Sequence, residues 1–213
     1  MRCVTALFSA LLLTACATTA PVASDAPHAP ATAEGIIAAS NAQRHYSVEA
    51  SGDPGYVQAR NRESGLRCRF DVRYGGSIHI YDAAPGGGAP GDDTSCNTPI
   101  DAITVTYYAT RYTTPTTTAE QAEAAIAAIR ERFDVLSEIA PTTPDRAGAR
   151  TRSFRINYEG KIKETRVSVA MVDGWVLKMR FTGPQNTLPL ADRLWADVLA
   201  DFEGAGRAAR PGV

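Results

Sequence analysis

The chain has 213 residues, with 22 basic and 23 acidic side chains and a formal net charge of −1. Proteins that bind nucleic acids usually carry a pronounced basic excess, so this balance argues against DNA or RNA as a partner. The hydrophobic share of 44% is that of a chain with a folded core.

Residues 1–15 have the features of an export signal. Arg2 supplies a short basic start, residues 4–13 are apolar, and small side chains precede Cys16. The apolar run is well below the ~20 residues that cross a bilayer as a helix, so we expect a segment that is removed. Ordinary secretory cleavage is an alternative, because the Ala-Cys-Ala sequence of residues 15–17 also fits that cleavage pattern.

The segment Leu13-Thr14-Ala15-Cys16 resembles the lipobox of bacterial lipoproteins. The resemblance implies that the Cys16 thiol receives a diacylglycerol and that the new amino terminus is acylated. Several acyl chains anchor a protein stably, because each buried CH₂ contributes ~0.8 kcal/mol. The residue after the cysteine is Ala17 and not the aspartate that favours inner-membrane retention. The resemblance therefore implies an outer-membrane anchor with the domain facing the periplasm.

Three segments follow the signal. Residues 16–33 begin with the lipidated cysteine and are rich in proline, alanine and threonine, so we expect a tether. Residues 34–204, about 170 residues, suffice for a single domain with one core. Residues 205–213 are expected to form a disordered tail.

Two cysteines remain in the expected domain, Cys68 and Cys96. In an oxidising compartment they are most simply a disulfide. A redox-active or metal-binding pair is the alternative. It lacks the C-x-x-C spacing and a nearby histidine cluster, since His45 and His79 stand alone.

The first half of the domain is predicted to hold one short helix and four strands. The helix covers residues 34–39, and the strands cover residues 56–59, 66–70, 77–81 and 103–110. In the last strand, Ile103, Val105, Tyr107 and Ala109 alternate with Thr104, Thr106, Tyr108 and Thr110. This alternation predicts one buried and one solvent-facing side.

A long helix is predicted after Thr117. Thr117 and Glu120 form a capping-box pattern. Apolar residues then follow at helical spacing, namely Ala122, Ile126, Ile129, Phe133 and Leu136. Pro141 is expected to end the helix.

Three strands and a last helix complete the chain. The strands cover residues 150–158, 161–171 and 175–181, and their two turns contain Glu159-Gly160 and Asp173-Gly174. In the third strand, Trp175, Leu177, Met179 and Phe181 are expected in the core, with Val176, Lys178 and Arg180 in solvent. The helix after Thr187 has a buried stripe of Leu190, Leu194, Trp195, Val198 and Phe202.

This order predicts an α+β fold, in which an antiparallel β-sheet of hairpins and a three-stranded meander packs with two amphipathic helices. Element order over residues 56–202 and the tryptophan in the last hairpin resemble the PsbP-like α/β/α sandwiches. Residues 64–70 (Ser-Gly-Leu-Arg-Cys-Arg-Phe) and 108–112 (Tyr-Ala-Thr-Arg-Tyr) are similar to uncharacterised exported proteobacterial proteins. Neither resemblance supplies catalytic residues, and the PsbP-like group implies partner binding.

Catalytic and metal-binding motifs are not found in the sequence. It contains no G-x-S-x-G or H-E-x-x-H pattern, and the glycine run at residues 86–88 lacks the lysine of a phosphate loop. Asp82, Asp92, Asp93 and Asp101 offer oxygen ligands for calcium, but their spacing does not match an ordered ligand loop. We therefore expect solvated turn carboxylates, no metal, no cofactor and no catalytic residue.

Basic residues gather on the predicted meander. Residues 146–180 hold nine basic side chains against three acidic ones. The candidates for anion binding are Arg150, Arg152, Arg155, Lys161, Lys163, Arg166, Lys178 and Arg180. Lipid A phosphates, phospholipid headgroups or an acidic protein are possible partners. A solvated face whose charges prevent aggregation is the alternative, and strand parity places Arg152 and Arg155 on opposite sides.

Three functions are compatible with these features. The first is a non-catalytic envelope lipoprotein, attached to the membrane by its lipid, that binds a protein or cell-wall component. The second is binding of an anionic lipid or glycolipid through the Arg146–Arg180 meander. The third is a hydrolase whose catalytic residues are scattered through the fold.

Overall fold

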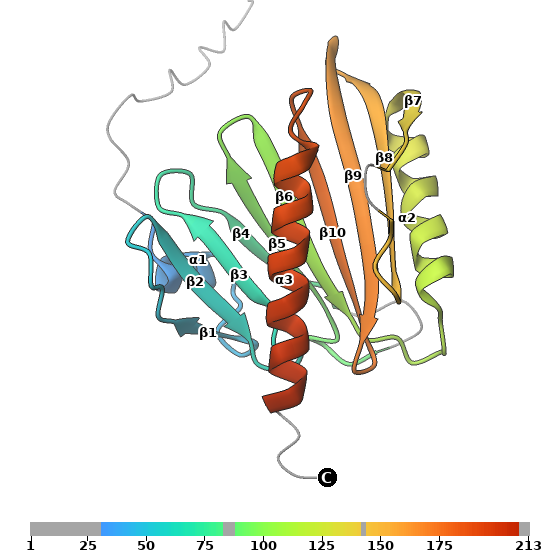
Figure 1. Ribbon diagram of the computed structural model, residues 1–213. Coiled ribbons are helices and arrows are strands. Elements are labelled where there is room, and N and C mark those ends of the chain that lie inside the picture. Colours follow the sequence, from blue (N-terminus) through green and yellow to red (C-terminus); the bar gives the residue numbers. More distant parts are fainter. Residues whose placement is uncertain (1–30, 83–87, 142–143, 209–213) are drawn as a thin grey trace, which may run out of the picture.

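The computed structural model describes residues 31–82, 88–141 and 144–208 (Figure 1). The expected export signal, the lipidation site Cys16, the tether up to residue 30 and most of the glycine loop lie outside these residues. The predictions for those segments stay predictions.

The strands form two antiparallel sheets. The smaller sheet has the order β1-β2-β3 and the larger has the order β4-β5-β6-β10-β9-β8-β7. The strands of the smaller sheet are β1 (Tyr46–Glu49), β2 (Tyr56–Asn61) and β3 (Arg67–Asp71). Those of the larger sheet are β4 (Ser77–Ile80), β5 (Asp93–Ile100), β6 (Ile103–Thr110), β7 (Asp134–Ile139), β8 (Ala149–Tyr158), β9 (Lys161–Val172) and β10 (Trp175–Gly183).

Three helices accompany the sheets, namely α1 (Ala33–Ala39), α2 (Thr118–Arg132) and α3 (Leu188–Ala208). Helix α3 and the smaller sheet pack on one face of the larger sheet, where Leu177 and Phe181 share a core with Trp195. Helix α2 packs on the opposite face, where Ile126 contacts the cluster that contains Val176. Figure 1 shows α3 along one face and α2 beside β8 at the sheet edge. The predicted α+β class is confirmed.

No helix within the described residues is long and apolar enough to span a bilayer.

A disulfide joins the two sheets. Cys68 on β3 and Cys96 on β5 have a sulfur–sulfur distance of 2.17 Å, and both residues are fully buried. Tyr46 and Phe70 of the smaller sheet belong to the same core. The predicted pairing is confirmed, and it fixes the smaller sheet on the larger one.

Both predicted hairpin turns of the meander are confirmed. Glu159, Gly160, Asp173 and Gly174 all have φ between 49° and 81°. Positive φ at both central residues is the geometry of a tight hairpin turn.

The predicted helix that ends near Pro141 is too long. Helix α2 begins with the expected capping box at Thr117 but ends at Arg132, with Phe133 as its C-cap. Residues 134–139 form β7, which pairs with β8, and Leu136 is 49% exposed. Pairing with the sheet edge satisfies the backbone of this segment, so helical spacing alone was misleading.

Other differences concern strands and boundaries. Strands β1, β5 and β7 were not predicted, because their segments contain too few alternating apolar residues. Helix α1 begins at Ala33, inside the segment expected as tether. Helix α3 continues to Ala208, four positions past the expected end of the domain at residue 204.

Removing the disulfide should destabilise the fold strongly. With a sequence separation of 28, the double variant Cys68→Ala/Cys96→Ala should lose about 3.6 kcal/mol of unfolding free energy on the chain-entropy model. Urea unfolding measures this, and reductant should move the natural chain to the same midpoint. Equal stability of the oxidised chain and the double variant would contradict the prediction.

Candidate functional site

Helix α2 leaves part of its sheet face uncovered. It packs over β7, β8 and β9, where Val167 and Val169 are buried beneath it. The same face of β4, β5 and β6, and of β10 beyond Val176, carries no described helix, and a groove of about 340 Å³ lies there. We call it the basic groove.

The basic groove has a floor of strand residues and a wall on one side. Its floor includes Asn97, Thr106, Tyr108 and Arg180. Its wall is formed by Arg132 and Phe133 at the end of α2 and by Tyr158 and Lys163 of the β8–β9 hairpin. No carboxylate lines it in the part of the chain that the structure describes.

Strand register places the floor residues in two rows. Ser77 pairs with Asn97, Asn97 with Thr106, and Thr106 with Arg180. The second row runs in the same way from His79 through Ser95 and Tyr108 to Lys178. Directly opposed residues of antiparallel strands point to the same side of a sheet. Each row therefore ends in a cation on β10, next to the wall.

Aromatic rings hold three of the cations. The Nζ atom of Lys163 lies 4.6 Å from the ring centre of Tyr158, and that of Lys178 lies 4.5 Å from the ring centre of Tyr108. The guanidinium carbon of Arg180 lies 4.9 Å from the ring centre of Phe133. Such contacts contribute about 0.5–1 kcal/mol each without neutralising the charge.

No described carboxylate is in ion-pair contact with these cations. Among the described residues, Arg132, Lys163, Lys178 and Arg180 form no ion pair within 4.0 Å. The acidic group whose charge acts on Lys178 is Asp93, and its carboxylate accepts a hydrogen bond of 2.8 Å from Thr110. The groove therefore keeps an excess of positive charge.

Burial makes this arrangement unfavourable for folding. Burial lowers the pKa values of both Lys178 and Arg180. The nearby positive charge of Arg132 lowers the pKa of Arg180 further. A lysine whose pKa is lower in the folded state destabilises the fold while charged, and this cost is relieved as pH rises through the folded-state pKa. A bound anion would relieve it at neutral pH.

The eight basic residues predicted for anion binding do not form one surface. Lys163 and Arg180 line the basic groove, with Lys178 beside it. Lys161 lies on the same sheet face, exposed at the β8–β9 turn. Arg150 and Arg152 are on β8, on the same sheet face. They pair with Val169 and Val167 of β9, which α2 covers. Arg152 is moreover 3.7 Å from Glu138 and 3.5 Å from Asp145.

Arg155 and Arg166 lie on the other face of the sheet. Arg155 is exposed there. Arg166 is 4% exposed, donates a 2.9 Å hydrogen bond from Nε to Ser153 Oγ, and pairs with Asp192 of α3. The expectation that Arg166 binds an external anion is corrected, because its guanidinium already has partners inside the protein.

Several groove residues were missed by the sequence reasoning. Arg132 is the last residue of α2, whereas the sequence predicted a helix that continued to Pro141. Asn97 lies on β5, which was not predicted. Tyr108 and Thr106 belonged to the predicted solvent side of their strand. Val176 was expected in solvent but is 3% exposed, because α2 covers it.

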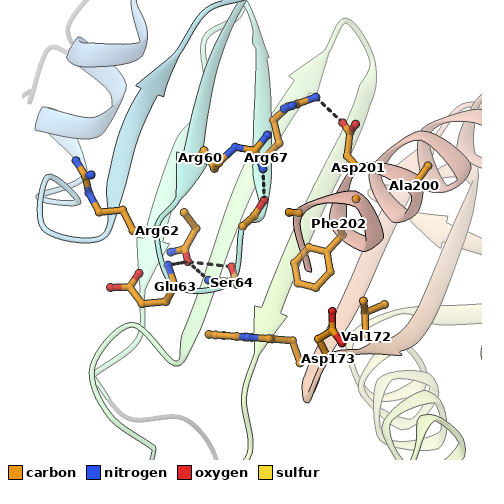
Figure 2. Close-up of a pocket in the computed structure, with 15 residues that line it drawn as sticks. Arg60, Arg62, Glu63, Ser64, Arg67, Val172, Asp173, Ala200, Asp201 and Phe202 are labelled. Carbon is orange, nitrogen blue, oxygen red and sulfur yellow. Dashed lines mark hydrogen bonds and ion pairs between the residues drawn. The ribbon is translucent and has the colours of Figure 1, made fainter. Parts of the chain in front are cut away.

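A larger cavity, of about 780 Å³, lies between the β2–β3 turn and the end of α3 (Figure 2). Two of the three arginines in its described lining are already paired with carboxylates. Arg60 and Arg67 both bind Glu49, at 2.8 Å and 2.7 Å, and Arg67 also binds Asp201 at 2.9 Å. With Arg60 and Arg67 neutralised and with Glu63, Asp173 and Asp201 also in its lining, this cavity is a weaker anion site than the basic groove.

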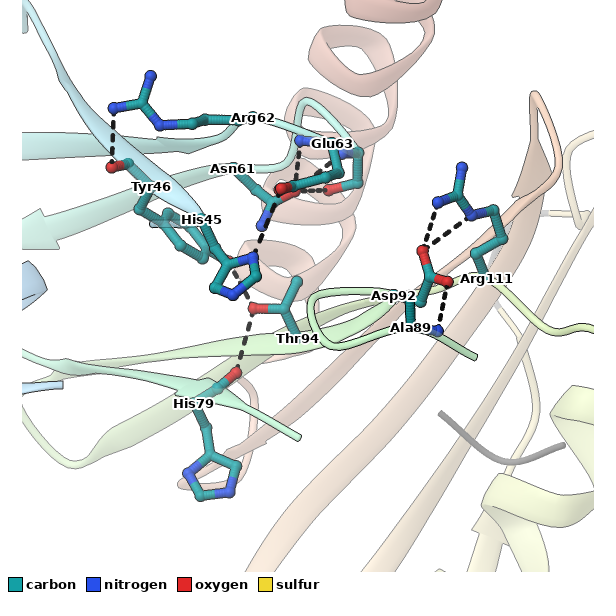
Figure 3. Close-up of polar contacts among 11 residues, drawn as sticks. His45, Tyr46, Asn61, Arg62, Glu63, His79, Ala89, Asp92, Thr94 and Arg111 are labelled. Atoms are coloured by element: carbon teal, nitrogen blue, oxygen red, sulfur yellow. Dashed lines mark hydrogen bonds and ion pairs between the residues drawn. The ribbon is translucent and has the colours of Figure 1, made fainter. Parts of the chain in front are cut away.

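His45, His79 and Asp92 lie apart (Figure 3). His45 Nδ1 is 3.4 Å from Glu63, whereas His79 projects away from it on β4. Asp92 is buried and accepts 2.9 Å hydrogen bonds from Arg111 Nε and from the Ala89 amide. The expectation of a solvated turn carboxylate is therefore wrong for Asp92. The described residues contain no group of three or more His, Cys, Asp or Glu suited to a metal ion.

Comparisons with known proteins identify no family. No protein-family model matches the chain, and no curated protein matches it. Among solved structures, it is similar to PA94, a protein of unknown function from Pseudomonas aeruginosa, with 12% sequence identity and a TM-score of 0.36. That match covers 73% of this chain and 94% of the other. A likeness this weak supports no functional argument.

The Arg166–Asp192 pair should be structural. Asp192→Ala leaves a buried guanidinium without its carboxylate and should lower the unfolding free energy by about 1–3 kcal/mol. The double variant Arg166→Met/Asp192→Leu should recover much of that loss, since an apolar pair replaces an ion pair. Urea unfolding measures both, and an Asp192→Ala variant of natural stability would refute the structural role.

Proposed function

We propose that this protein is a non-catalytic binding module, anchored in the outer membrane through lipidated Cys16, whose basic groove binds an anionic component of the cell envelope. One observation carries the proposal. Lys163, Lys178 and Arg180 are held on aromatic rings, and no carboxylate among the groove's described residues neutralises them.

The energetics of these cations support a binding role. A cation that serves only solubility is fully hydrated, whereas Lys178 and Arg180 are half-buried and have lowered pKa values, chiefly through burial. Groups that cost folding free energy are typical of functional sites. A ligand with negative charge would supply the missing counter-charge and accept charge-assisted hydrogen bonds.

The polar contacts of the groove support binding over covalent catalysis. They join hydroxyls and an amide, as in the 3.4 Å contacts between Tyr81 and Ser95 and between Thr106 and Asn97. Covalent catalysis needs a nucleophile hydrogen-bonded to a base, and the described groove residues offer none. Charge and hydrogen-bond donors suit recognition.

An anionic lipid surface is a second candidate, and one observation favours it. At the tip of the β8–β9 hairpin, Lys161 is exposed and the neighbouring Ile162 is 49% exposed. A basic and an apolar side chain together suit contact with the headgroup region of an anionic bilayer. The groove's Lys163 lies two residues further along the same strand.

Replacing Arg180 should separate binding from stability. We introduce Arg180→Met into the mature chain with Cys16→Ser. Its salt-sensitive binding to lipopolysaccharide or to peptidoglycan fragments should weaken at least ~10-fold, because the loss of a charged contact costs about 1.4 kcal/mol of binding free energy. Thermal unfolding should be unchanged or shifted upward, because an uncompensated buried charge is removed.

Arg155→Met is the matched control, since Arg155 is an exposed arginine on the opposite sheet face. It should bind as the natural chain does. Failure of every anionic envelope probe to bind, or equal losses in both variants, would count against the basic groove as the binding site.

The anchor is tested separately by cysteine replacement. Cys16→Ala should abolish labelling with radioactive palmitate and release the protein from the outer-membrane fraction. Cys3→Ala, inside the expected signal, should change neither. Persistent labelling of the Cys16→Ala chain would refute lipidation at this residue.

A further inference from the structure

We infer that the ligand of the basic groove is a saccharide that carries a phosphate or carboxylate group. Its anionic group would lie against Arg180, and its hydroxyls would follow the two polar rows across β6, β5 and β4. This inference rests on the proposed function and names the ligand class of that same site.

The anionic end is defined by converging cations. Arg180 on β10 lies close enough to Arg132 of α2 for their charges to interact, and Lys163 lines the same wall. Lys178 occupies the neighbouring row, two residues from Arg180 on the same strand. A guanidinium presents paired donors that match two oxygens of a phosphate or carboxylate. The end of the rows on β10 is therefore where a negative group is stabilised most.

The rows extend well beyond what a bare anion needs. Ser77, Asn97 and Thr106 continue the first row away from Arg180 across three further strands. With neighbouring strands about 4.8 Å apart, the four strands span about 14 Å. That length is several times the size of a phosphate ion and suits a ligand with a series of hydroxyl groups.

The side chains in the rows offer both donors and acceptors. Thr106 donates a 3.4 Å hydrogen bond to Asn97 Oδ1, which leaves the Asn97 amide nitrogen without a partner among the described residues. Tyr81 and Ser95 share a 3.4 Å contact between hydroxyls that can also face a ligand. Sugar hydroxyls are donors and acceptors at once, so mixed groups of this kind match them.

Aromatic rings stand beside the rows. His79 and Tyr81 pack edge to face, with ring centres 4.5 Å apart, and Tyr108 is half-buried between the strands. The C–H face of a sugar ring packs well on such rings. An acyl chain would need aliphatic surface, and the described lining of the groove contains no aliphatic side chain. The floor therefore favours a saccharide over the tails of a phospholipid.

Calorimetric titration of the mature chain with Cys16→Ser tests the ligand class. The probes are trehalose 6-phosphate, a uronic-acid disaccharide, trehalose and inorganic phosphate. At least one anionic disaccharide should bind 10-fold or more tightly than inorganic phosphate, and trehalose should bind more weakly than either anionic sugar. Lipopolysaccharide and its delipidated polysaccharide distinguish a lipid-linked from a free saccharide.

Two variants separate the anionic end from the hydroxyl rows. Asn97→Ala should weaken binding of the anionic disaccharide several-fold and leave phosphate binding unchanged, whereas Arg180→Met should weaken both. Asn157→Ala is the matched control, because Asn157 is exposed on the opposite face of β8.

The outcomes distinguish this inference from the proposed function. Equal affinity for phosphate and the anionic disaccharides, with no effect of Asn97→Ala, would overturn the saccharide inference and leave anion binding intact. If Arg180→Met changed the binding of no anionic probe, both would fail.

Discussion

One helix cannot cover one face of a seven-stranded sheet. The outer strands of such a sheet lie about 29 Å apart at 4.8 Å per strand, whereas a helix with its side chains is about 10 Å wide. On one face, α3 and the smaller sheet together cover the shared core. On the other, α2 alone packs over β7 to β9 and the start of β10. The basic groove follows from this incomplete coverage, because the strands that α2 does not cover must carry polar side chains on that face.

The disulfide determines which face stays open. Cys68 and Cys96 attach the smaller sheet to the same side as α3, so these two layers share that side. The residues that face the other way on β5, such as Ser95 and Asn97, are left for solvent or a ligand. Strand β5 thus has a structural role on one face and a recognition role on the other.

Strand alternation made much of this predictable. Alternation in the sequence assigned Tyr107 and Met179 to the buried side of their strands and Tyr108 and Arg180 to the solvent side. The residues on each face of β6 and β10 could therefore be predicted without knowing that these strands pair. That pairing joins segments separated by α2, β7, β8 and β9, and no local pattern encodes so distant a contact. The composition of the basic groove could therefore not be predicted, although several of its residues could.

Two errors have the same physical origin. Leu136 fits a helical stripe, and Val176 fits a solvent-facing position, when each is judged by its sequence neighbours. Tertiary contacts decide otherwise, since the residues on either side of Leu136 pair with β8 in the sheet and α2 buries Val176. Arg166 shows the same for charge, because its partner Asp192 comes from the last helix.

The central claim is that recognition occurs on the open face of the larger sheet. An amide chemical-shift titration of the mature chain with delipidated polysaccharide tests it most directly. The account predicts that the perturbed signals belong to Tyr108, Lys163, Arg180 and their strand neighbours. Perturbations confined to the β2–β3 turn and the end of α3, where the larger cavity lies, would contradict it.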